Sequence, residues 1–151
     1  MNLQHITPYL AHGVRFISNL DKPFGGHDYK PIWTLSGVLP LFGDFCAHTK
    51  ENNDAYPLFT IKLLLRPLSD LTKEIEHNGN KFVPIDILGE DFGEIELNRT
   101  NENRSFYVDF ESYKRFDDFY MIYNKLFEWH FDVFGLIETS QAVNINIVYG
   151  K

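Results

Sequence analysis

A thiol and an imidazole that lie close together are the first candidates for catalysis. Cys46 and His48 are separated by one residue and would share one side of an extended segment, as a nucleophile and its base require. No third group that would orient His48 is identifiable, so a packed thiol beside a turn histidine is the favoured interpretation. The adjacent acids Asp117 and Asp118 are explained by the start of a helix. We therefore expect that the protein is not an enzyme.

The sequence indicates neither a nucleotide cofactor nor a metal. Segment 89–93 carries two acids where a phosphate-binding loop needs backbone donors and a lysine. None of the six histidines forms a pair four residues apart. His27 and Asp28 could supply two metal ligands, with His5 or His12 completing the site, but a solvent-exposed loop histidine is favoured. We expect no metal and no cofactor.

The composition bounds the class of protein. The chain has 151 residues, of which 44% are hydrophobic, so it can bury a core. Its net charge of -7 argues against a protein that holds nucleic acid mainly through phosphate contacts. A single cysteine excludes an intramolecular disulfide. The N-terminus does not resemble a signal peptide and no apolar run is long enough for a bilayer, so we expect a cytoplasmic protein without membrane contacts.

Three surfaces could bind a partner. Six acids between positions 86 and 102 form either an ordinary solvated surface or a patch that docks into a basic groove: Asp86, Glu90, Asp91, Glu94, Glu96 and Glu102. The loop at 21–31, broken by two glycines and two prolines, offers Phe24, His27, Asp28 and Tyr29 as further contacts. Alternatively, Arg99, Arg104 and Tyr107 could form a small surface on which single-stranded RNA or DNA stacks.

The elements that must position these residues follow from hydrophobic periodicity. Apolar residues at steps of three and four predict an amphipathic helix over 116–134, and a shorter helix over 67–76. Alternation predicts strands at 13–19 and 58–65 and a hairpin from 94–97 to 105–110. Residues 81–87 are expected to be extended or a short turn, and 142–149 a final strand.

No regular alternation of strands and helices is present. The pattern therefore favours an α+β fold, in a single domain over 1–151. We expect an antiparallel or mixed sheet, with the long C-terminal helix of about 116–134 packed on it.

Several segments resemble a known group of sequences. They are 65–75 and 81–85 (LRPLSDLTKEI and KFVPI), 125–138 (KLFEWHFDVFGLIE) and the opening ITPYL at 6–10. These blocks look like a family of small uncharacterised proteins from phages and prophages of the Bacteroidota. The resemblance covers about a third of the chain, implies no catalytic residues, and does not extend to the middle or the end of the sequence.

The resemblance and the charge together predict an inhibitor or adaptor. Small acidic phage proteins without catalytic motifs are frequently of this kind, so the expected partner is a host defence protein. An anti-CRISPR protein that blocks an RNA-guided nuclease, or its guide RNA loading, is the leading hypothesis. Direct binding of single-stranded nucleic acid and a structural role as a homo-oligomer remain the alternatives.

Overall fold

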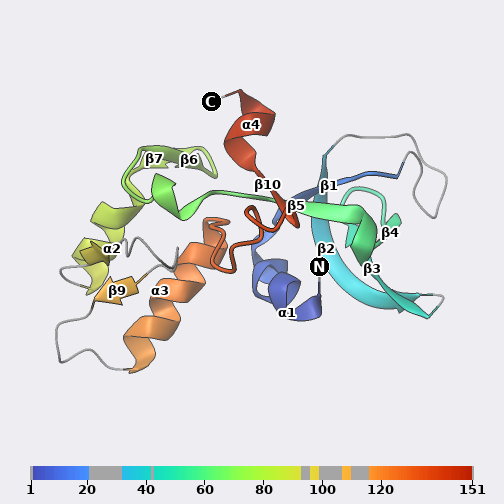
Figure 1. Cartoon of the computed structure of the whole chain (residues 1–151), viewed down its shortest axis with the longest axis horizontal. Coiled ribbons are helices and arrows are strands. Elements are labelled where there is room, and N and C mark those ends of the chain that lie inside the picture. Colours follow the sequence, from blue (N-terminus) through green and yellow to red (C-terminus); the bar gives the residue numbers. More distant parts are fainter. Residues whose placement is uncertain are drawn as a thin grey trace.

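The fold is α+β and is built on a mixed sheet of six strands, as expected (Figure 1). In the computed structural model, residues 2–20, 32–41, 43–92, 96–98, 107–109 and 116–150 are described. The strands of the sheet are β1 (Arg15–Ser18), β2 (Trp33–Leu41), β3 (Asp44–Thr49), β4 (Ala55–Pro57), β5 (Ile61–Leu65) and β10 (Ala142–Asn144).

The strand order in the sheet is β10-β5-β1-β2-β3-β4. The pairs β5–β1, β1–β2, β2–β3 and β3–β4 are antiparallel, whereas β10 runs parallel to β5. Three consecutive leucines of β5, at 63–65, are all fully buried. A strand with apolar residues on both sides is expected where both faces of a sheet are covered.

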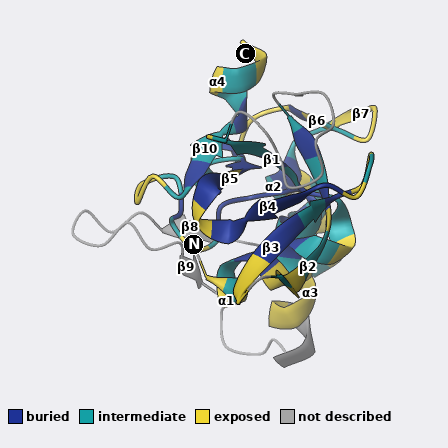
Figure 2. Ribbon diagram, turned by 90° about the vertical axis from the view of Figure 1, so that its right-hand side faces the viewer, coloured by how far each residue is buried: buried dark blue, intermediate teal, exposed yellow. Residues whose placement is uncertain are grey.

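The first hydrophobic core lies between this sheet and the N-terminal segment. Helix α1 (Leu3–Ile6) continues into the 3-10 helix η1 (Thr7–His12). Another 3-10 helix, η2 (Leu58–Thr60), lies between β4 and β5. Tyr9 of η1 and Phe16, Trp33 and Tyr56 of the strands are at most 1% exposed. Figure 2 shows the resulting run of buried ribbon through β4 and β5.

A second core lies beside the sheet and joins two helices to a hairpin. It is built by 3-10 helix η3 (Leu68–Asp70), β6 (Ile75–His77), β7 (Asn80–Phe82), α2 (Pro84–Phe92) and α3 (Phe116–Glu128). Its buried side chains are Leu71, Ile75, Leu88, Ile122, Leu126, Trp129 and Phe131. The remaining elements are β8 (Glu96–Asn98), which pairs with β9 (Tyr107–Asp109), and the C-terminal helix α4 (Ile145–Tyr149).

The helix predicted over 67–76 is wrong. Only η3 is helical there, and the chain then enters the antiparallel hairpin β6–β7. The turn between the two strands is Asn78–Gly79, with φ values of 51° and 80°. Two successive positive φ values are what a tight hairpin turn requires, so this dipeptide reverses a strand instead of ending a helix.

The long C-terminal helix is also corrected. Helix α3 ends at Glu128 instead of 134, and the last helix of the chain is the short α4. His130 takes a φ of 61°, and Phe131 then forms a parallel bridge with Arg66. The Arg66 amide donates to the His130 carbonyl at 2.8 Å, and the Asp132 amide donates to the Arg66 carbonyl at 2.8 Å. These bonds replace a further helical turn, and α3 packs on the second core and η1 instead of on the sheet.

Two other segments are more helical than the sequence predicted. Residues 84–92 form α2, which Pro84 begins at a position where a missing N–H costs nothing. The expected final strand stops at Asn144, whose side chain accepts a hydrogen bond from the Asn146 amide at 2.9 Å and so caps α4.

The turn between α3 and β10 depends on one buried carboxylate. Asp132 is 5% exposed and accepts hydrogen bonds from the amides of Leu136 and Ile137, each at 2.8 Å. Asp132→Ala should lower the free energy of unfolding by about 2 kcal/mol, because both amides lose a charged acceptor. Asp132→Asn keeps one acceptor oxygen and should cost less. Urea unfolding followed by tryptophan fluorescence measures both, and equal losses for the two variants would contradict this role.

Candidate functional site

The cysteine–histidine pair has the predicted placement but not the chemistry of a nucleophile. Both residues lie on β3, and Cys46 is 1% exposed. Burial raises the pKa of the Cys46 thiol, and the nearby Asp44 carboxylate raises it further. A raised pKa leaves little thiolate at neutral pH, which disfavours nucleophilic attack. Within the described part of the chain, no three His, Cys, Asp or Glu side chains are arranged to hold a metal.

His130 is a buried histidine and is 7% exposed. Its Nε2 lies 2.9 Å from the His12 carbonyl, and its ring is 5.2 Å from the ring of His77. Burial lowers its pKa to about 4, and the charges of His77, Arg66 and Arg15 act in the same direction, against the hydrogen bond to His12. The imidazole is therefore neutral at physiological pH and donates its Nε2 proton to the carbonyl.

The structure describes the side chains of three of the six acids that were predicted to form an acidic surface. Asp86, Glu90 and Asp91 lie on α2 and are all exposed. Asp91 approaches Lys125 of α3 at 3.8 Å, between partly exposed side chains. Positions 86 and 90 are one helical turn apart, so their carboxylates share a face of α2.

The other predicted contact residues lie mostly outside the described residues. Glu96 belongs to β8 and Tyr107 to β9, where the backbone alone is described. The positions that fall outside are Glu94, Glu102, Phe24, His27, Asp28, Tyr29, Arg99 and Arg104.

Helix α3 carries an exposed aromatic face, although its apolar side was expected to pack on the sheet. Ile122 and Leu126 are buried at 1% and 0%, and Trp129 continues their row. The neighbouring face of the helix is exposed, with Tyr120 70% and Tyr123 40% exposed three residues apart, and Phe119 at its margin 37% exposed. The apolar stripe is wider than the surface that covers it: Ile122 and Leu126 pack in the second core and α3 also contacts η1, whereas Tyr120 and Tyr123 stay exposed.

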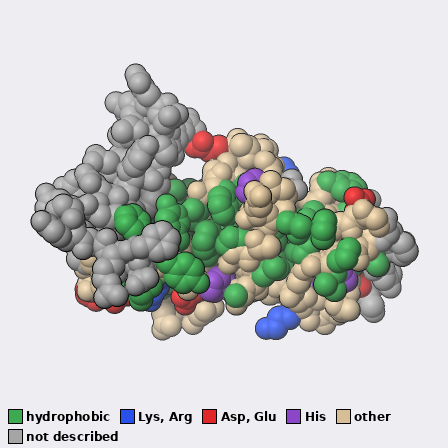
Figure 3. Space-filling model, turned by 90° about the horizontal axis from the view of Figure 1, so that it is seen from below, with side chains coloured by type: hydrophobic (Ala, Val, Ile, Leu, Met, Phe, Trp, Pro, Cys, Tyr) green, Lys and Arg blue, Asp and Glu red, His purple; other side chains and the backbone are tan. Residues whose placement is uncertain are grey.

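The open face continues along a row of aromatic rings. The ring centres of Tyr123 and Phe127 are 6.4 Å apart, and those of Phe127 and Phe134 are 5.7 Å apart. The ring centre of Phe134 is 5.3 Å from that of His5 in α1. Figure 3 views this side from below and shows hydrophobic side chains in a band from α3 toward the sheet.

Beyond α1 the band reaches an apolar pocket of about 530 Å³. The N-terminal segment contributes Asn2, Leu3 and Gln4, and the sheet side contributes Asp44, Phe45, Leu58 and Phe59. Phe45 is 46% and Phe59 is 75% exposed. Large aromatic side chains left open over such a distance are typical of a binding surface. We name the exposed residues Phe119, Tyr120, Tyr123 and Phe134 the aromatic face.

The fold and this surface define an α+β protein with an open aromatic face beside an acidic helix. Comparisons with protein-family models, with curated proteins and with solved structures each found no match. Among the described helices, none is both long enough and apolar enough to cross a bilayer.

Proposed function

We propose that this protein is a non-enzymatic inhibitor or adaptor that binds another protein through the aromatic face of α3. The observation that carries the proposal is the exposure of Tyr120 and Tyr123 on one face of a helix whose neighbouring face, at Ile122 and Leu126, is buried. Tyrosine, phenylalanine and methionine are enriched at the centres of protein interfaces, where they bury large areas with few rotatable bonds.

The acids of α2 supply a charged surface on the flank of α3 that bears Lys125, across the helix from Tyr120 and Tyr123. Helices α2 and α3 share the second core through Leu88 and Leu126, and the Asp91–Lys125 pair joins their exposed sides. Carboxylates beside an apolar centre favour a partner with a basic surface, because they accelerate the encounter and restrict the orientation of docking. Asp86 and Glu90 are the residues that would steer the association.

A host defence protein with a basic channel fits this surface. The net charge of -7 and the resemblance to phage proteins support an RNA-guided nuclease as the partner, and the bacterial cytoplasm as the place of action. Occupation of the guide channel, or of the path by which guide RNA enters it, would then inhibit the enzyme without any catalysis by this protein.

A plaque assay tests the proposal in a host that carries an RNA-guided nuclease and a guide against the infecting phage. Expression of the protein should restore plaques. The double variant Tyr120→Ala, Tyr123→Ala should lose this effect, and its affinity for the purified nuclease should fall by roughly 30-fold, as expected for interface anchors.

Ile147→Ala is the matched control for this experiment. Ile147 is 77% exposed but lies on α4, away from the aromatic face, so its removal should change neither plaque formation nor affinity. A wild-type protein that restores no plaques would refute the proposed inhibitor. A double variant that binds the nuclease as tightly as the wild type would refute the aromatic face.

A further inference from the structure

Two arginines from neighbouring strands lie on the same side of the sheet. In the antiparallel pair β1–β5, Phe16 is opposite Leu63 within the first core. One residue further, Arg15 is opposite Leu64 and therefore points to the other face. Arg66 follows Leu64 by two residues, so its side chain projects on the same face as that of Arg15.

The backbone holds Arg66 in place. Its Nε donates to the Trp129 carbonyl at 3.2 Å, and its Nη2 donates to the Glu76 carbonyl at 2.6 Å. Two of the five N–H donors of the guanidinium are thereby used, and the other three have no partner among the described residues. The arginine is thus fixed in position while much of its donor capacity remains open.

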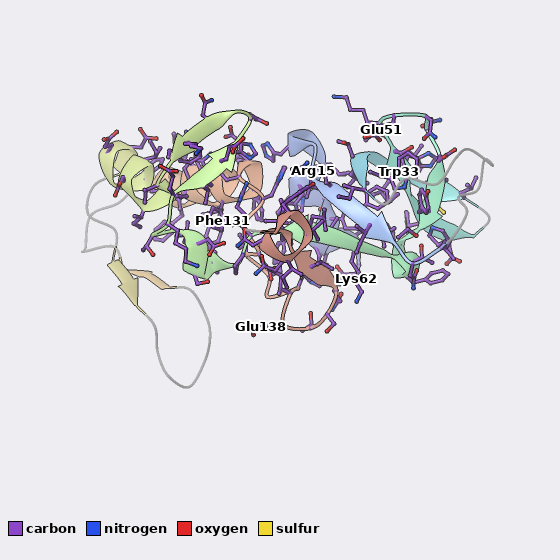
Figure 4. All side chains as sticks on the ribbon, turned by 90° about the horizontal axis from the view of Figure 1, so that it is seen from above. Arg15, Trp33, Glu51, Lys62, Phe131 and Glu138 are labelled. Carbon is purple, nitrogen blue, oxygen red and sulfur yellow. The ribbon has the colours of Figure 1, made fainter. Side chains whose placement is uncertain are left out.

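Arg15 is oriented by the last helix. Its guanidinium carbon lies 4.9 Å from the ring centre of Tyr149, which is 41% exposed. Since β10 runs parallel to β5 with Asn144 opposite Leu65, α4 begins beside Arg66 and carries Asn146 and Tyr149 over the two arginines. Figure 4 shows α4 from above, beside the strand that bears Arg15.

The two guanidiniums are close enough for their positive charges to repel each other. Burial lowers the pKa of Arg66, the Asp70 carboxylate opposes that effect, and the charge of Arg15 adds to it. Among the described residues, no carboxylate forms an ion pair with either arginine. Asp70 is engaged elsewhere, by Lys73 and by the Asn146 amide, each at 2.6 Å.

These residues line one groove with a volume of about 380 Å³. Its lining consists of Arg15, Arg66, Glu76, Ile145, Asn146 and Tyr149. The volume falls within the range of small-molecule sites and would hold a ligand of the size of a nucleotide. Guanidiniums are suited to phosphate because their planar donors match its oxygens. The side-chain carbonyl oxygen of Asn146 can accept a hydrogen bond from a hydroxyl group on the rest of a ligand.

We propose that this groove binds a small organic phosphate, a phosphate monoester of a hydroxyl-bearing carrier such as a sugar phosphate or a nucleoside monophosphate. The phosphate lies between Arg15 and Arg66, and the carrier faces Asn146. A long polyanion is disfavoured, because the chain as a whole has a net charge of -7 and would repel it beyond the groove.

Titration calorimetry at pH 7.5 in physiological salt tests the site with four probes: AMP, ribose 5-phosphate, inorganic phosphate and adenosine. AMP and ribose 5-phosphate should bind, inorganic phosphate should bind more weakly, and adenosine should not bind. Tighter binding of AMP than of ribose 5-phosphate would show that a base adds contact with Tyr149, and equal binding would assign the carrier contacts to the sugar. A rise in melting temperature with AMP provides a second readout of the same equilibrium.

Arg15→Gln is the informative variant, because the Arg15 side chain, unlike that of Arg66, donates no hydrogen bond within the described part of the fold. It should weaken AMP binding at least about tenfold, as expected for a lost charged hydrogen bond. Lys62→Gln is the matched control, because it also removes one positive charge. Lys62 lies on the same sheet face but does not line the groove: it is opposite Ile17, four residues before Arg66 and about 13 Å from it along the strand.

Four outcomes would overturn the site. They are undiminished AMP binding by Arg15→Gln, an equal loss in Lys62→Gln, adenosine or inorganic phosphate binding as tightly as AMP, and no calorimetric or thermal response to any phosphate. None of them bears on the proposed inhibitor, whose aromatic face shares no residue with this groove.

Discussion

Phe131→Ala is expected to lower the free energy of unfolding by about 4 kcal/mol. The ring of Phe131 is fully buried in the second core, so its removal deletes apolar contacts and leaves a cavity that the neighbouring side chains fill only in part. The backbone of the same residue also joins the two cores. The Tyr9 hydroxyl, from the first core, donates to the Phe131 carbonyl at 2.7 Å.

Urea unfolding followed by tryptophan fluorescence measures this loss, because Trp33 belongs to the first core and Trp129 to the second. Phe59→Ala is the matched control: the same atoms are removed from a side chain that is 75% exposed, and the change should stay within about 0.5 kcal/mol. Equal losses in the two variants would contradict the assignment of Phe131 to the core.

Acidification is expected to destabilise the protein through His130. The pKa of this imidazole is about 4 in the folded chain, against 6.5 for the free side chain, because burial penalises the charged form. The unfolded chain therefore binds the proton more readily. The stabilisation from this group is fully present above pH 6.5 and is lost as the pH falls from 6.5 to about 4. The full loss amounts to about 3 kcal/mol.

The pKa of His77 is lowered as well, first by burial and then by the charge of Arg66, so it adds to the same slope. His130→Asn separates the contribution of His130, because asparagine tolerates the positive φ at this position and does not titrate. Unfolding free energies measured from pH 7.5 to 4 should fall less steeply in this variant than in the wild type. Identical slopes would show that His130 does not control the acid response.

The parts of the fold that the sequence predicted are those governed by local alternation. The strands predicted at 13–19 and 58–65 contain β1 and β5. In the predicted hairpin, β9 lies within 105–110, and β8 overlaps 94–97 and extends one residue past it. The helix at 67–76 failed although Leu71 and Ile75 are buried as expected. Their spacing suits a helix, but the Asn78–Gly79 turn and the pairing of β6 with β7 outweigh that local preference.

The two candidate sites depend on contacts that periodicity does not encode. The spacing of apolar residues placed Tyr120 and Tyr123 on one face of a helix, but the width of the surface packed against it decides which of them stay exposed. The arginine groove requires the register of β1 and β5, together with the parallel addition of β10. Arg15, Arg66 and Tyr149 are far apart in the sequence, and no motif connects them.

The parallel pairing of β10 with β5 has a consequence for synthesis of the chain. Strand β5 is complete at Leu65, but the strand that covers its outer edge ends at Asn144. At the usual rate of translation, several seconds pass between the two on the ribosome. Throughout that interval, an apolar strand of five residues has backbone donors and acceptors without partners on one side. We expect nascent chains stalled before β10 to be captured by chaperones or to aggregate, and chains that include α4 to escape both.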